Sequence, residues 1–214
     1  MATVTATRLT ADEFYDFVHK PRNAGRYFEL ERGEVIELPP PGIRHGIVCG
    51  NVAYKLIQYA IEVKRGFVGT NDTGVIVEED PDTVRGADVS YYDDDSDFET
   101  VEIRYSYDPP LLVAEILSPD DRISRVIIRT DQYLKRGVAL FWLVDPEVRT
   151  VTVYRKGREP ITLTDADELT GEDVLKGFRC RVADLFAMPG AKKGAKAARK
   201  NGKRPPKPKG KRNR

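Results

Sequence analysis

Two single carboxylates interrupt stretches of this chain that are otherwise almost entirely apolar. Asp88 lies in the run GADVSYY (86–92), and Glu115 lies in the run LLVAEIL (111–117). A buried charge costs free energy unless it is paired or binds a metal. If the two runs are neighbouring strands, both carboxylates can share one divalent cation, and such a cation activates water for hydrolysis. The pattern therefore predicts a metal site.

The segment around Glu115 has the pattern of a strand, a helix and a second strand. Residues 118–121 (SPDD) are of the capping type and predict the helix entry, and Gly137 predicts the helix end. The apolar run 138–144 then predicts a strand that stops at the turn 145–146. This order predicts a parallel pair with the helix packed on the sheet. The expected buried stripe of the helix is Ile123, Val126, Ile127, Thr130, Tyr133 and Leu134.

Basic residues flank this predicted stripe. At 100° per residue they fall within about 60° of one another on the helix surface. Such a flank would face a phosphate backbone, and the alternative is a solvated helix edge. The four residues are Arg122, Arg125, Arg129 and Arg136.

Several of these segments resemble one family of proteins. AEILSPDDR, a helix ending in YLKRGV, and FWLVDP together resemble the Uma-two family of restriction endonucleases, which belongs to the PD-(D/E)XK nuclease superfamily. GADVSYY resembles the family's PDV strand, with Ala87 in place of the proline, and YFELERGEVIEL (27–38) resembles its YELIDGE hairpin. The similarity covers roughly residues 9–185. It implies an α/β fold with a restriction-endonuclease-like mixed sheet, flanking helices and additional hairpins.

The resemblance also implies a role for individual residues. Asp88 matches the metal-binding aspartate, and Glu115 matches the acidic residue of the (D/E)XK element. With the Ile116 carbonyl, they would hold Mg²⁺ or Mn²⁺. The lysine position of the element is Leu117, and the helix lysine that replaces it in the family corresponds to Arg129. Arginine cannot accept a proton near neutral pH, but it can orient water or stabilise charge on a phosphate.

Two further polar residues fall at positions that the resemblance places near a catalytic site. Glu29 alternates with apolar neighbours in the predicted hairpin, so it either faces the site or lies on an exposed face. His45 opens the first long helix and is either catalytic or a structural hydrogen-bonding partner.

The remaining patterns complete the expected fold. They predict a capped helix over residues 11–19, a hairpin over 26–38, a long helix over 43–66, strands near 67–70 and 74–77, a hairpin over 150–163 and a terminal helix near 182–186. Gly-rich phosphate loops and the Cys/His spacings of zinc sites are absent from the sequence.

The charge of the chain is unevenly distributed. Its formal net charge is +1, but residues 190–214 hold 12 Lys/Arg and no acid. Removing those 12 from the 35 basic residues leaves 23 against 34 acidic residues, a net charge of −11. We therefore expect a nuclease-like domain over residues 1–189 and a disordered basic tail over 190–214. The tail either attracts nucleic acid or solubilises the chain. Its expected contacts are Lys192, Lys193, Lys196, Arg199 and Lys200.

Composition narrows the class of protein. Two cysteines do not form a disulfide framework, the N-terminus lacks the apolar core of a signal peptide, and no apolar run approaches the ~20 residues of a membrane span. A cytoplasmic protein is the simplest interpretation. The favoured function is metal-dependent hydrolysis of phosphodiester bonds in DNA. The alternatives are a catalytically weak or inactive nucleic-acid-binding protein, and a structural protein whose two carboxylates are merely ion-paired. The sequence leaves open whether the chain forms a homodimer.

Overall fold

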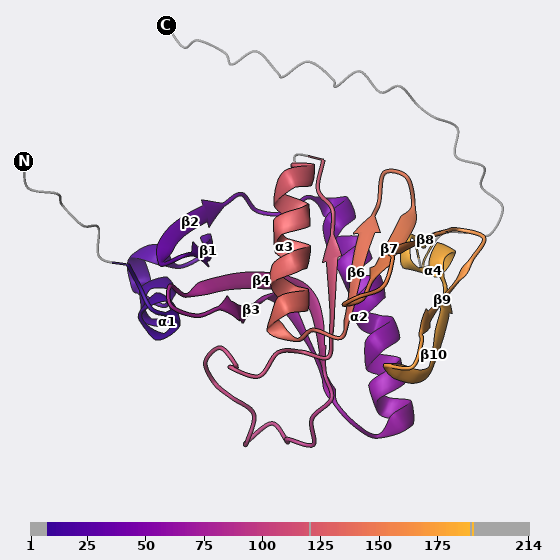
Figure 1. Ribbon diagram of the computed structural model, residues 1–214, viewed down its shortest axis with the longest axis horizontal. Coiled ribbons are helices and arrows are strands. Elements are labelled where there is room, and N and C mark those ends of the chain that lie inside the picture. The colour runs from indigo at the N-terminus through magenta and orange to yellow at the C-terminus, as the bar shows by residue number, and fades with distance from the viewer. Residues whose placement is uncertain (1–7, 120, 189, 191–214) are drawn as a thin grey trace, which may run out of the picture.

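The chain forms a mixed α/β fold, which a computed structural model describes for residues 8–119, 121–188 and 190 (Figure 1). Its helices are α1 (Ala11–Val18), the 3-10 turn η1 (Pro21–Asn23), α2 (Ile43–Val63), α3 (Ile123–Arg136) and α4 (Val182–Leu185). Its strands are β1 (Tyr27–Glu31), β2 (Glu34–Leu38), β3 (Phe67–Glu78), β4 (Thr83–Tyr92), β5 (Leu112–Ile116), β6 (Leu140–Asp145), β7 (Thr150–Tyr154), β8 (Ile161–Thr164), β9 (Glu168–Gly171) and β10 (Leu175–Arg181). Among the described helices, none has the length and apolar character needed to cross a membrane.

One eight-stranded sheet organises the fold. Seven of its strands follow the order β2-β1-β4-β5-β6-β7-β8, and β3 pairs with β4 off this path. β5 and β6 are parallel, whereas the other paired strands of this sheet are antiparallel. The predicted parallel pair, with α3 as its connection, is therefore confirmed, as is the mixed sheet flanked by helices.

Two helices, α2 and α3, cover opposite faces of the sheet (Figure 1). Alternate residues of β5 pack against each of them. Ala114 packs in the cluster that contains Leu56 of α2, whereas Val113 packs in the cluster that contains Tyr133 of α3. Glu115 follows Val113 by two residues, so it lies on the face covered by α3.

The N-terminal elements fix the position of β1. Thr10 and Glu13 form the predicted capping box at the start of α1. α1 then buries Phe14 against Leu30 of β1 and Ile76 of β3 in a separate apolar cluster. This packing holds β1 beside β4.

The structure differs from the predictions in the helix α3. The expected core residues Ile123 and Ile127 are 78% and 62% exposed, because α3 buries only residues of its C-terminal half against the sheet. The expected cap at residues 118–121 is also wrong. Arg122 is the N-cap and makes no side-chain cap hydrogen bond, while the Asp121 carboxylate accepts a hydrogen bond from the Ser118 amide.

Two differences concern strands. The two strands expected near residues 67–70 and 74–77 are one strand, β3, which is interrupted by a bulge rather than by a turn. The small sheet β9–β10 was not predicted from the sequence, and its register is irregular between Leu175 and Arg179. An irregular ladder breaks the period-two alternation by which strands are recognised.

The uneven burial of α3 leads to a test of stability. Ile127→Ala should change the free energy of unfolding by less than about 0.5 kcal/mol, because the side chain is exposed. Leu56→Ala, at a fully buried position of α2, should cost about 2–5 kcal/mol. Denaturant unfolding of both variants measures the contrast. Equal losses would mean that Ile127 is buried in solution.

Candidate active site

The site begins where β4 and β5 separate. Their ladder ends at the pair Val89 and Ala114. Beyond it, the Asp88 carboxylate takes the place of a backbone acceptor, because its Oδ2 accepts a hydrogen bond of 2.7 Å from the amide of Ile116. The carboxylate is almost fully buried. One backbone amide therefore holds Asp88 next to the strand that carries Glu115.

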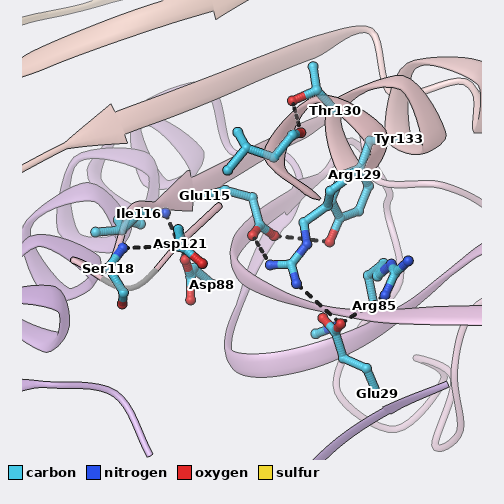
Figure 2. Close-up of polar contacts among 12 residues, drawn as sticks. Glu29, Arg85, Asp88, Glu115, Ile116, Ser118, Asp121, Arg129, Thr130 and Tyr133 are labelled. Carbon is cyan, nitrogen blue, oxygen red and sulfur yellow. Dashed lines mark hydrogen bonds and ion pairs between the residues drawn. The ribbon is translucent and has the colours of Figure 1, made fainter. Parts of the chain in front are cut away.

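The Glu115 carboxylate is held by two residues of α3 (Figure 2). Tyr133 donates from its hydroxyl to Oε1 at 3.0 Å, and Arg129 donates from Nη1 to Oε2 at 2.8 Å. The two donors are four residues apart, so they lie on one face of the helix. Burial and the charge of Asp88 raise the pKa of Glu115, while Arg129 opposes the shift. The Arg129 guanidinium therefore points toward Glu115 rather than into solvent.

Arg129 also reaches a second carboxylate, Glu29 of β1. Its Nη2 donates to Glu29 Oε2 at 3.1 Å, and Arg85 donates to the same oxygen at 3.0 Å. The other oxygen, Oε1, accepts from the Gly86 amide at 3.2 Å. Arg85 is fixed in turn by Gln132 of α3. Glu29 is thus buried inside the protein, and the exposed hairpin face considered for it is wrong.

His45 approaches Asp88 from the first turn of α2. Its Nε2 lies 3.2 Å from Asp88 Oδ2, and its Nδ1 lies 3.4 Å from the Sγ of Cys49. The hydrogen bond to Asp88 raises the pKa of His45, and burial opposes this shift. From the sequence, Cys49 was noted only as one of two cysteines that form no disulfide framework, although its spacing of four residues from His45 on a predicted helix was a usable signal.

A further acid, Asp72, was also missed. In the ladder of β3 with β4, Thr70 pairs with Val89 and Thr73 pairs with Ala87. Residues 71 and 72 therefore both lie opposite Asp88, which is the arrangement of a β-bulge.

The backbone at the bulge directs Asp72 toward this region. Asn71 and Asp72 have left-handed φ angles of 64° and 56°, which asparagine and aspartate tolerate better than most residues. A Cβ atom on Gly86 would lie 2.9 Å from the Cβ of Asp72, so the glycine makes the close approach possible. Burial and the charge of Asp88 raise the pKa of Asp72 to about 6. An Asn-Asp pair between two apolar runs was the available sequence signal.

The four arginines of the basic flank of α3 lie in different surroundings. Arg122 and Arg125 are exposed, whereas Arg129 turns into the carboxylate cluster. Arg136 forms an ion pair with Glu79 and donates to the Tyr107 carbonyl, so its guanidinium is engaged within the protein. The expected contacts Lys192, Lys193, Lys196, Arg199 and Lys200 lie outside the described residues.

The raised pKa of Asp72 predicts a stability that depends on pH. In EDTA, Asp72→Asn should raise the free energy of unfolding by roughly 1–3 kcal/mol above pH 6, because burial disfavours the charged carboxylate. The gain should shrink as pH falls from 6 toward 4 and vanish below the ordinary aspartate pKa of 3.8, where Asp72 is protonated in the folded and in the unfolded chain. Urea unfolding from pH 4 to 8 measures it, with the exposed Glu99→Gln as the control. A variant that is less stable than the parent at pH 8 would contradict this.

Comparisons with known proteins agree with this architecture. The family model for Uma2, described as "putative restriction endonuclease", matches residues 11–183. A crystal structure of a "putative nuclease" from Anabaena variabilis superposes with a TM-score of 0.69 at 21% sequence identity, covering 83% of this chain and 97% of the other. At that identity the likeness shows the fold alone. No match was found among curated proteins. Because the family model spans most of the sequence, the chain belongs to the Uma2 family, as its motifs indicated.

Proposed function

We propose that this chain is a metal-dependent nuclease that hydrolyses phosphodiester bonds in DNA. One arrangement carries the proposal. Arg129 of the following helix donates a hydrogen bond to Glu115 of β5, and Asp88 of the adjacent strand β4 accepts a hydrogen bond from the amide of the residue after Glu115. Two strand carboxylates with a cation beside them are the elements that metal-assisted phosphodiester hydrolysis requires. Membership of a family described as "putative restriction endonuclease" supports this function.

The residues present fit a divalent cation. Four carboxylates gather here, from Glu29, Asp72, Asp88 and Glu115, against the two guanidinium groups of Arg85 and Arg129. Negative charge is therefore in excess, and it contributes to the raised pKa values of Asp72 and Glu115.

Oxygen ligands suit Mg²⁺ or Mn²⁺. Asp88, Glu115 and the Ile116 carbonyl would hold the cation. When bound, it would polarise the phosphate and lower the pKa of a water molecule.

The surrounding side chains would position these groups. Tyr133 fixes one oxygen of Glu115, and His45 fixes one oxygen of Asp88. Arg129 stays protonated, since the charge of Glu115 raises its pKa further, so it would neutralise charge on the phosphate rather than accept a proton. Glu29 acts through Arg129, whose second nitrogen it binds, and is a positioning residue.

The alternative function, a catalytically weak or inactive nucleic-acid-binding protein, is favoured by one specific observation. Arg129 already occupies one oxygen of Glu115 and one of Glu29. A guanidinium in that place competes with a cation for the same carboxylates. In either case, DNA would contact the exposed Arg122 and Arg125 and the basic residues after position 190, because the rest of the chain is acidic.

A plasmid-nicking assay tests the nuclease. We expect nicking with Mg²⁺ or Mn²⁺, none in EDTA, and a loss of at least ~10²-fold in Asp88→Asn and in Glu115→Gln, on the scale of removing one stabilising group from an active site. The exposed Glu99→Gln is the matched acidic control and should nick like the parent. Nicking that survives EDTA and both substitutions would refute the proposal. DNA binding in EDTA without any nicking in Mg²⁺ would favour the alternative.

The role of Arg129 is tested by Arg129→Lys beside Arg129→Met. Lysine keeps the charge near Glu115 and restores the residue type of the superfamily, so the nicking rate should be preserved or raised. It reaches one carboxylate rather than two, and the lost bond to Glu29 should cost roughly 1–3 kcal/mol of stability. Arg129→Met removes the charge and should lower nicking by ~10²–10³-fold. A folded but inactive lysine variant would show that Arg129 does not stand in for the lysine.

A further inference from the structure

A cysteine, a histidine and an aspartate lie together where α2 meets β4. His45 and Cys49 are four residues apart, so both side chains leave the same face of α2. Cys49 Sγ is 3.4 Å from one ring nitrogen of His45, and the other ring nitrogen is 3.2 Å from Asp88 Oδ2. One ligand atom from each of the three residues lies within 4.8 Å of the other two.

We propose that His45, Cys49 and Asp88 bind a thiophilic divalent cation of the Zn²⁺ type. Zinc takes thiolate, imidazole and carboxylate ligands at roughly 2.0–2.3 Å in tetrahedral geometry, which places neighbouring ligand atoms about 3.3–3.8 Å apart. The observed contacts of 3.2 and 3.4 Å involve different ring nitrogens of His45, so one of them joins two ligand atoms of such an ion, and the three ligand atoms together lie within 4.8 Å of one another. Small side-chain rotations would bring one His45 nitrogen, the sulfur and the carboxylate around one ion, with water at the fourth position.

A nucleophilic cysteine is the competing explanation for the same three residues. The order thiol, imidazole, carboxylate matches that of a Cys-His-Asp hydrolase. Burial and the nearby charges of Asp88 and Asp72, however, raise the pKa of Cys49 and keep it a thiol. The same negative surroundings attract a dication, and a thiol that coordinates a dication loses its proton. The negative surroundings of Cys49 therefore suit a bound cation better than catalysis by sulfur.

The ligand types separate this site from the magnesium site. Thiolate and imidazole select zinc-like ions, whereas Mg²⁺ prefers oxygen ligands. Asp88 belongs to both sets, so the two cations would exclude one another there and a zinc-like ion would oppose cleavage. This last consequence rests on the proposed function, whereas the zinc site itself does not.

Spectroscopy with Co²⁺, a coloured substitute for Zn²⁺, tests the site on the full chain. We expect one Co²⁺ to bind with a thiolate-to-cobalt charge-transfer band and intense tetrahedral d–d bands, and Zn²⁺ to abolish both. Cys49→Ser should lose the charge-transfer band and weaken Zn²⁺ binding by at least ~10–100-fold, the usual cost of losing even an outer-shell partner. His45→Asn should weaken Zn²⁺ binding as well. Cys180→Ser is the matched control, since this second thiol is buried in β10, and it should keep the band.

Several outcomes would overturn the proposal. The proposal is wrong if the parent chain shows no thiolate-to-cobalt band. It is also wrong if the band persists in Cys49→Ser or disappears in Cys180→Ser. Circular dichroism checks that each variant is folded. As a second measurement, Zn²⁺ should raise the unfolding temperature of the parent and of Cys180→Ser but not that of Cys49→Ser. No measurement here needs DNA cleavage, so a failed nicking assay and a failed zinc site are distinguishable.

Discussion

The burial of carboxylates in the centre of the sheet is the constraint on which the rest of this structure depends. Glu29, Asp88 and Glu115 are each less than 10% exposed. Removing an ion from water costs several kcal/mol unless hydrogen bonds and opposite charges compensate. Each carboxylate is compensated by different groups. The Ile116 amide and His45 hydrogen-bond to Asp88, donors on α3 hydrogen-bond to Glu115, and Arg85 together with a donor on α3 binds Glu29. The polar network therefore forms only when β1, β4, β5, α2 and α3 are all in place.

Arg129 connects parts of the fold that the sheet alone keeps apart. Its two terminal nitrogens bind Glu115 of β5 and Glu29 of β1, and β4 lies between those strands. The planar fork of a guanidinium can bridge two carboxylates, whereas a lysine ammonium acts as a point charge. An arginine at position 129 thus has a structural consequence. It couples the N-terminal hairpin to the strand that bears Glu115, and it places a permanent cation among the acids.

The bulge in β3 shows how the fold holds an unfavourable charge near its site. Asn71 and Asp72 adopt left-handed backbone conformations, and Gly86 lacks the side chain that would push Asp72 away. Strained backbone of this kind persists when the surrounding structure determines it, and it is common near functional sites. Here it adds a fourth carboxylate to a region already rich in negative charge. The proposed cation sites would use that excess charge, which costs stability when no cation is bound.

The sequence by itself determined the local framework of the site. The apolar run around Glu115, the helical spacing after it and the second apolar run were enough to predict a parallel pair with a crossover helix. The lone charge in each strand was enough to single out Asp88 and Glu115. These are local signals, because side-chain periodicity and the cost of burying a charge can be recognised within a few residues.

Only the tertiary structure decided which other side chains join the two acids. The bulge register places Asp72 opposite Asp88, the packing of α2 brings His45 and Cys49 to Asp88, and pairing of β1 with β4 buries Glu29. The same packing leaves Ile127 exposed, although its spacing matched a buried stripe. Strand register and helix docking are set by contacts between segments far apart in the chain, so periodicity within one segment cannot specify them.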